Sequence, residues 1–169
     1  LAGAAGIGLI ALMLLAPIPA RGHADLTPAA GEGLADALEA ALLGLKPIGA
    51  DIRRSMLTGS RKAWRRMAAE AEFVAADAGR GPWRRHSIMG IATDPPYGRA
   101  SSTHGEAPLA LYDRSFAALD DVLPPGHAIA ITLPTAEAVA LGETHWTLAE
   151  RYAMRVHRSL TRTFCVFVT

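Results

Sequence analysis

Short apolar runs alternate with segments of helical periodicity along this chain of 169 residues. The apolar runs predict strands over residues 22–26, 47–51, 72–76, 87–93, 127–133, 152–156 and 163–168. The segments between them predict helices over 34–45, 52–68 with a break near Gly59, 108–122, and 135–150 with Thr135 as N-cap. Strands that alternate with helices indicate a parallel, doubly wound sheet. The last two strands have no helix between them and predict an antiparallel hairpin at one edge.

The first 20 residues carry no charge, and this stretch allows two interpretations. It is long enough to span a membrane, and the sequence ARGHA near its end resembles the end of a secretory signal. However, three glycines and two prolines make it a poor uninterrupted helix, which favours a buried helix over 4–15 instead. Since the chain starts at Leu1 and ends directly after an apolar run, we expect it to be a piece of a longer protein.

Composition excludes several classes of protein. With 50% hydrophobic and 20% charged residues, the chain is neither disordered nor collagen-like. A net charge of +1 gives no overall basic field of the kind that indicates nucleic-acid binding. The single cysteine, Cys165, excludes internal disulfides. No histidines stand at metal-ligand spacing, so no metal site is predicted.

One basic segment stands out, because residues 46–85 hold ten Lys or Arg residues against four acids. These cations could contact RNA phosphates. The alternative is an ordinary solvated helix face, which is the more common role of a charge run.

Candidate binding residues lie where predicted strands end, which is where ligands bind in such sheets. Gly31 and Gly33 follow the first strand and allow a tight turn with close approach of a ligand. Asp51 ends the second strand, twenty residues after Gly31, a spacing typical of an acid that accepts hydrogen bonds from ribose hydroxyls. Asp77 follows the third strand and could accept from an adenine amine. Together they predict a nucleoside-cofactor site, the alternative being a helix-start glycine and solvated acids.

The most informative motif is Asp94-Pro95-Pro96-Tyr97, directly after the fourth predicted strand. Its prolines stiffen the backbone, so that a carboxylate, a carbonyl and an aromatic ring are presented together. The exocyclic amine of a base could donate to the Asp94 carboxylate and the Pro95 carbonyl while Tyr97 stacks on the ring. The alternative is a proline-rich turn.

This motif resembles the signature of methyltransferases that methylate exocyclic amines of nucleobases with S-adenosylmethionine. The strings ATDPPYGRASSTHGE (92–106) and RVHRSLTR (155–162), together with residues 37–64, resemble a narrower family. These are the archaeal and eukaryotic tRNA guanosine N2-methyltransferases that act on the guanosine at position 10. The resemblance extends over about residues 26–168. The D-P-P-Y motif alone leaves adenine-N6 methyltransferases as an alternative.

The resemblance implies a Rossmann-like class I methyltransferase domain over residues 1–169. Its expected α/β fold is a mixed seven-stranded sheet with helices on both faces and an antiparallel C-terminal hairpin. The helix over 4–15 would precede the first strand, and the upstream THUMP-type RNA-binding region of the family is absent from this chain. The resemblance further implies S-adenosylmethionine as cofactor, tRNA as substrate, a small activator subunit as in eukaryotic relatives, a cytoplasmic location and no membrane role.

Carried over position by position, the resemblance assigns a role to each candidate residue. The implied cofactor-binding residues are Thr27, Gly31, Gly33, Asp51, Ile52 and Asp77; the catalytic residues are Asp94, Pro95, Pro96 and Tyr97; and the substrate-binding residues are Arg99, Ser101 and Ser102. One departure concerns the cofactor loop, which reads D-P-x-C-G-T-G in the family. Here Thr27 replaces the leading carboxylate and Glu32 introduces another. Both changes would weaken cofactor binding, which leaves a degenerate, non-catalytic module as an alternative.

Overall fold

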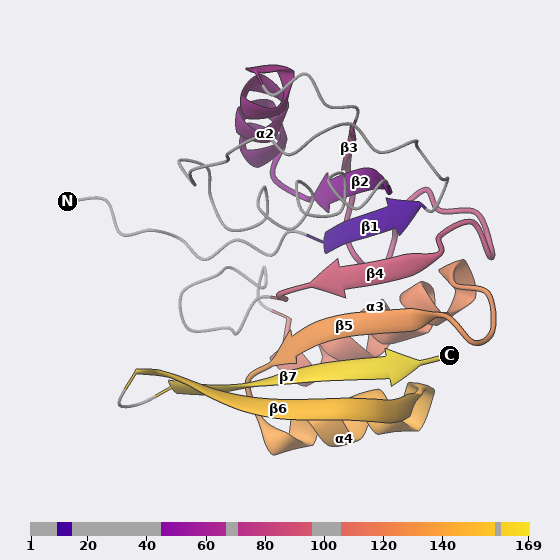
Figure 1. The fold of residues 1–169 in the computed structure, drawn as a ribbon, viewed down its shortest axis with the longest axis vertical. Helices are drawn as coiled ribbons and strands as arrows, with labels where there is room; N and C mark the ends of the chain where they lie inside the picture. Colours follow the sequence, from indigo (N-terminus) through magenta and orange to yellow (C-terminus); the bar gives the residue numbers. More distant parts are fainter. Residues whose placement is uncertain (1–9, 15–44, 67–70, 96–105, 158–159) are drawn as a thin grey trace.

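The computed structural model describes residues 10–14, 45–66, 71–95, 106–157 and 160–169 (Figure 1). Its strands are β1 (Ile10–Leu14), β2 (Lys46–Asp51), β3 (Glu72–Ala75), β4 (Gly90–Thr93), β5 (Ala128–Leu133), β6 (Thr147–His157) and β7 (Leu160–Val168). Its helices are α2 (Arg54–Arg66), α3 (Pro108–Val122) and α4 (Ala136–His145). The strands form one mixed sheet in the order β3-β2-β1-β4-β5-β7-β6.

The strand directions bring four carboxyl ends to one edge of the sheet. β2 pairs in parallel with β3, and β4 pairs in parallel with β5. β1 is antiparallel to both β2 and β4, so those two strands also run in the same direction. Ile10 has Ala50 as its partner on one side and Thr93 on the other, which sets the ends of β2 and β4 level. We call the edge at which β2, β3, β4 and β5 end the carboxyl edge.

β1 corrects the expectation of a helix over residues 4–15, because residues 10–14 are a strand. Periodicity cannot assign an uninterrupted apolar run to a helix or a strand. Here the run supplies backbone hydrogen-bond partners to β2 and β4, which flank it. The predicted strand over 22–26 and helix over 34–45 lie outside the described residues. No helix in the described part of the chain is both long and apolar enough to cross a membrane.

Most other predicted elements are confirmed, with corrections to their bounds. The strand predicted over 87–93 begins only at Gly90, as β4. α2 continues through Gly59, so the expected break is wrong; a glycine weakens a helix but removes none of its hydrogen bonds. α4 begins after Thr135, whose side chain accepts from the Ala138 backbone N–H as predicted, but it ends at His145 and not at 150. Trp146 leaves the helix because its side chain enters the core and its indole N–H donates to Asp120 at 2.9 Å. Residues 147–150 therefore belong to β6.

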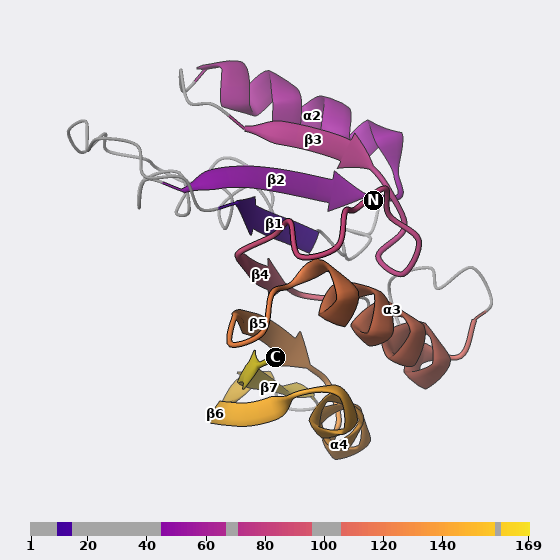
Figure 2. The same ribbon diagram turned by 90° about the vertical axis from the view of Figure 1, so that its right-hand side faces the viewer.

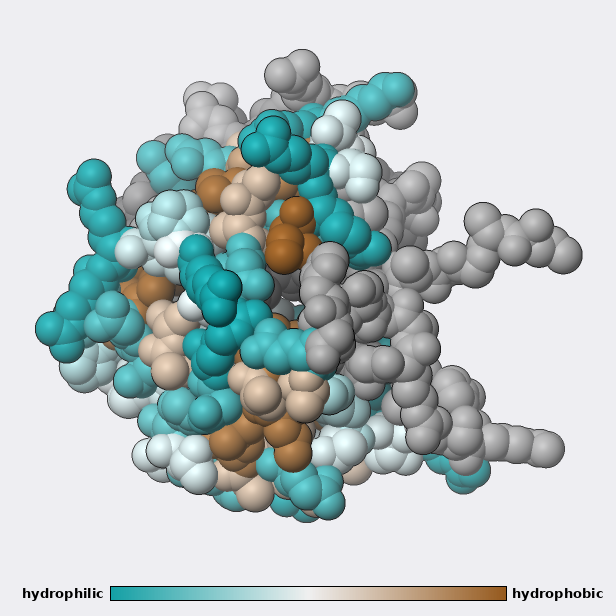
Figure 3. Space-filling model, turned by 180° about the vertical axis from the view of Figure 1, so that it is seen from behind, coloured by the Kyte–Doolittle hydropathy of each residue, from teal (hydrophilic) through white to brown (hydrophobic). Residues whose placement is uncertain are grey.

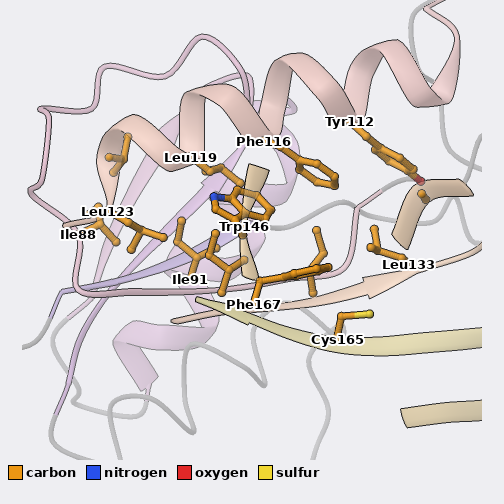
Figure 4. Close-up of a cluster of buried hydrophobic side chains, with 14 of the residues drawn as sticks. Ile88, Ile91, Tyr112, Phe116, Leu119, Leu123, Leu133, Trp146, Cys165 and Phe167 are labelled. Carbon is orange, nitrogen blue, oxygen red and sulfur yellow. The ribbon is translucent and has the colours of Figure 1, made fainter. Parts of the chain in front are cut away.

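The main core lies between the sheet and α3 (Figure 4). Alternate residues of β5 and β7 point into it and pack against one face of α3 and the indole of Trp146. The strands contribute Ile129, Ile131, Leu133, Cys165 and Phe167, and α3 contributes Tyr112, Phe116 and Leu119. α3 and α4 lie on the same face of the sheet, whereas α2 packs against β2 and β3 at its other end (Figure 2). Viewed from the α3 and α4 side, the surface mixes hydrophilic residues with smaller hydrophobic patches (Figure 3). α3 exposes Asp113, Asp120 and Asp121.

Candidate cofactor and catalytic site

Three carboxylates from different strands lie along the carboxyl edge. Asp51 is the last residue of β2, Asp77 follows β3 by two residues, and Asp94 comes directly after β4. Along the edge of the sheet their spatial order is Asp77, Asp51, Asp94, and β1 lies between the strands that carry Asp51 and Asp94. Neighbouring strands are about 4.8 Å apart, so the strands that carry Asp77 and Asp94 are separated by about 15 Å.

Asp51 is buried, with 3% of its surface exposed. Its Oδ1 accepts from the Arg53 backbone N–H at 2.6 Å, and Arg53 Nε lies 3.7 Å from the same oxygen. Its Oδ2 is buried and has no hydrogen-bond partner among the described residues. Burial raises the pKa of Asp51 and outweighs the lowering effect of Arg53. A buried acceptor that is left open costs about 1–3 kcal/mol, so this oxygen suits a ligand hydroxyl. The neighbouring Ile52 is 50% exposed.

Asp77 is held by a guanidinium from α3. Nη1 of Arg114 donates to Oδ1 of Asp77, and Nη2 donates to Oδ2 at 3.2 Å. The same Arg114 Nη2 contacts Glu106 Oε2 at 2.8 Å, and the Gly79 backbone N–H donates to Asp77 Oδ1 at 2.9 Å. The hydrogen bond from Arg114 is the main cause of a lowered pKa of Asp77. Arg114 therefore keeps this carboxylate ionised and ties the loop after β3 to α3.

We expect Arg114→Met to destabilise the fold at neutral pH, and to destabilise it less at pH 3. Because Arg114 lowers the pKa of Asp77, their ion pair stabilises the fold above the ordinary Asp pKa of 3.8, and this contribution disappears as the pH falls through the lowered pKa. Both side chains are partly exposed, so solvent limits the effect to about 1 kcal/mol, or about 2–4 °C in Tm. Thermal melts at pH 7 and pH 3 measure it. Arg85→Met, which removes an exposed pair with Asp121, is the control and should change neither melt. An Arg114→Met deficit of equal size at both pH values would contradict the assignment.

Asp94 lies near groups from two other elements, Arg162 on β7 and Tyr112 on α3. Nη1 of Arg162, on β7, donates to Asp94 Oδ2 at 3.0 Å. Both side chains are partly buried, with 22% of Arg162 and 31% of Asp94 exposed. Burial, together with the negative charge of Asp94, raises the pKa of Tyr112 on α3 to about 12, so its hydroxyl keeps its proton at neutral pH. The ends of β4 and β7 and one turn of α3 therefore meet around one carboxylate.

The structure brings five of the predicted site residues to the carboxyl edge: Asp51, Ile52, Asp77, Asp94 and Pro95. The others lie outside the described residues; these are Thr27, Gly31, Gly33, Pro96, Tyr97, Arg99, Ser101 and Ser102. In the basic segment, the guanidinium of Arg61 donates to the backbone carbonyl of Phe73. At least this cation of α2 is used within the fold.

Arg114, Tyr112 and Arg162, which hold or flank the acids, are not among the site residues predicted from the sequence. Arg162 lies within the string 155–162, which carries part of the family resemblance. Tyr112 stands four residues before Phe116 on the same helix face, and this spacing could have identified it as a core residue. For Arg114 we find no signal in the sequence.

Comparisons with known proteins agree with this architecture. The family model described as "RMKL-like, methyltransferase domain" (UPF0020) matches residues 13–164. A tRNA (guanine(10)-N2)-dimethyltransferase of Methanothermobacter thermautotrophicus is 35% identical over 127 residues, which are 74% of this chain and 38% of that enzyme. The chain therefore spans well under half the length of this curated relative.

Two solved structures have a similar fold. The PH0226 protein of Pyrococcus horikoshii superimposes with a TM-score of 0.63 at 13% identity, covering 81% of this chain and 76% of that one. The N-methyltransferase NodS of Bradyrhizobium japonicum, solved with S-adenosyl-L-homocysteine, gives a TM-score of 0.56 at 9% identity, covering 70% of this chain and 64% of that one. At these identities the likeness shows a methyltransferase-like fold alone. Together with the family match over residues 13–164, it shows that the chain belongs to the RMKL-like methyltransferase domain family.

Proposed function

We propose that this chain binds S-adenosylmethionine and transfers its methyl group to the exocyclic N2 amine of a guanosine in tRNA. The observation that carries the proposal is the order of the three acids along the carboxyl edge, Asp77, Asp51 and Asp94. S-Adenosylmethionine presents an adenine amine, ribose hydroxyls and a methyl sulfonium in the same order. The relative that shares 35% identity is named for methylation of guanine N2 in tRNA, which favours guanine over the alternative of adenine N6.

The residues at the edge fit the cofactor. The open Oδ2 of Asp51 can accept from a ribose hydroxyl, which would satisfy a buried oxygen. A carboxylate offers about four acceptor positions, so Asp77 can take an adenine amine in addition to Arg114 and Gly79. The exposed side chain of Ile52 gives the adenine ring an apolar surface. We further propose that the loop with Thr27, Gly31 and Gly33 holds the methionine part.

The bound cofactor supplies an electrophilic methyl group, and the chain must activate and aim the amine. A guanine amine is a poor nucleophile because its lone pair is delocalised into the ring. Acceptance of its N–H groups by Asp94 and the Pro95 carbonyl would localise that lone pair and align it for in-line attack. Positive charge develops on the amine as the bond forms, and the Asp94 carboxylate stabilises it. The departing proton passes from the amine to Asp94 and then to water.

The remaining parts of the proposal concern the whole molecule. Residues 1–169 form one domain with the class I methyltransferase layout, in which Tyr97 stacks on the target base and Arg99, Ser101 and Ser102 border it. A base within a duplex must be extruded to reach Asp94. The supporting observation is the position of Asp94 at the strand end that leads into this segment.

The test is methyl transfer from labelled S-adenosylmethionine to an unmodified tRNA transcript with guanosine at position 10. We expect label in N2-methylated guanosine. A transcript with inosine at position 10 lacks only the 2-amino group and should accept no label there. Label in N6-methyladenosine would favour the adenine alternative. Cofactor binding without transfer to any nucleoside would indicate the degenerate module.

A further inference from the structure

The β6–β7 hairpin extends past the carboxyl edge next to Asp94 (Figure 1). Leu133, the last residue of β5, pairs with Thr163, so β7 residues 160–162 lie beyond the end of β5. Arg162 in this extension reaches Asp94 at 3.0 Å. The other two acids lie on the far side of β4, in the β2 and β3 half of the sheet. The hairpin therefore borders the half of the edge that the cofactor acids leave open.

One face of this hairpin exposes large apolar side chains. Tyr152 is 58% exposed, Met154 is 56% exposed and Phe164 is 41% exposed. In the strand register Tyr152 is opposite Phe164 and Met154 is opposite Arg162. Since side chains alternate across a sheet, these four share one face, which we call the hairpin face. Cys165 and Phe167 point to the other face, into the core.

The position of the hairpin face next to Asp94 favours the RNA substrate as its partner. Arg162 lies at the inner end of the face and contacts Asp94, and Glu150 shares the face beside Tyr152. Arg151 and Arg155 pair with Cys165 and Thr161, so these two arginines are exposed on the opposite face of the hairpin. Three apolar side chains on a two-stranded ribbon also present far less area than the roughly 800 Å² that each partner of a stable protein pair buries.

Resting on the proposed function, we propose that the hairpin face is the RNA-docking surface of this site, where Tyr152 and Phe164 stack on bases that flank the target nucleotide. Exposed aromatic rings next to an active site are a usual means of holding unpaired bases. The Tyr152 hydroxyl donates to Glu150 at 2.8 Å, which holds the ring in place. Arg162 connects the surface to the chemistry, because it contacts the carboxylate that receives the amine.

The test measures the Kd of a fluorescein-labelled tRNA transcript by anisotropy, with the chain saturated with S-adenosylhomocysteine. We expect Tyr152→Ala and Phe164→Ala each to weaken RNA binding by about tenfold, the loss of one stacked base. Tyr152→Phe keeps the ring and should stay within about twofold of the unmodified chain. Thr161→Ala is the matched control, since Thr161 is exposed on the opposite face of the same hairpin, and it should not change the Kd.

Calorimetry with S-adenosylhomocysteine separates this inference from the proposed function. Alanine variants that bind S-adenosylhomocysteine normally but lose RNA affinity support the hairpin face as the RNA-docking surface. Unchanged RNA binding in both alanine variants, equal loss in Tyr152→Phe, or no RNA binding by the unmodified chain overturns it. A change in self-association by sedimentation without a change in RNA Kd also overturns it. If Phe164→Ala unfolds, Tyr152→Ala decides alone, because Tyr152 is the most exposed of the three. Failure of S-adenosylhomocysteine binding by every form counts against the proposed function instead.

Discussion

Asp94→Ala is expected to lower kcat for methyl transfer by at least about a thousandfold while leaving cofactor affinity within about threefold. The two effects separate because Asp94 lies at the end of β4, whereas the acids assigned to ribose and adenine lie at the ends of β2 and β3. The variant removes the acceptor that aims the amine and the charge that stabilises it as it becomes cationic. Single-turnover transfer from labelled cofactor measures the rate, and calorimetry measures the affinity.

Asp94→Asn distinguishes charge from hydrogen bonding at this position. Its amide oxygen still accepts from the target amine, but the negative charge is gone. We therefore expect a rate of methyl transfer between the rate of the native chain and the rate of Asp94→Ala. Both variants leave Arg162 without its carboxylate, so melting curves must accompany them. A folded Asp94→Ala chain that also loses cofactor binding would argue against a catalytic role and place Asp94 in the cofactor pocket.

Local patterns predicted the elements that depend on local interactions. Pro108 at the helix start and the apolar spacing after it predicted α3 with the bounds that the structure has. The acids Asp51 and Asp94 were predicted at strand ends and lie at the ends of β2 and β4. A strand end is visible in a sequence because an apolar run stops at a polar residue, and no distant partner is needed to recognise it.

The parts that the sequence did not predict depend on distant partners. Arg114 and Asp77 are 37 positions apart, and Arg162 and Asp94 are 68 positions apart, so no local pattern connects them. Residues 10–14 form a strand because they pair with β2 on one side and β4 on the other. The apolar run itself gives no information about these distant pairing partners. α4 ends earlier than predicted for a similar reason, because Trp146 packs against Phe116 with ring centres 4.9 Å apart. The ends of helices and strands therefore depend on packing between distant residues, which the hydrophobic periodicity of the sequence does not reveal.

Asp51→Asn is expected to weaken cofactor binding by at least about a hundredfold, because a neutral amide replaces the charged acceptor of ribose hydroxyls. The same change should leave the melting temperature of the free chain unchanged or raise it. Burial raises the pKa of Asp51 above its ordinary 3.8, which means that its ionised form is less favourable in the folded chain than in the unfolded one. Removing that charge therefore removes an unfavourable contribution to the free energy of folding. A residue kept for stability would behave in the opposite way, and a marked fall in melting temperature would contradict a binding role.

The pH dependence of cofactor affinity gives an independent test of Asp51. Binding requires the carboxylate, so affinity in the native chain should fall as acidification passes the raised pKa, at a pH above the ordinary 3.8. Arg53 lowers the pKa of Asp51 through its backbone N–H and its charge, so Arg53→Met removes the charge and should move this loss of affinity to higher pH. Asp51→Asn should bind weakly at every pH with no such dependence. Calorimetry from pH 8 down to the ordinary pKa of 3.8 distinguishes the three forms, and a native chain whose affinity stays constant over this whole range would show that cofactor binding does not depend on the charge of Asp51.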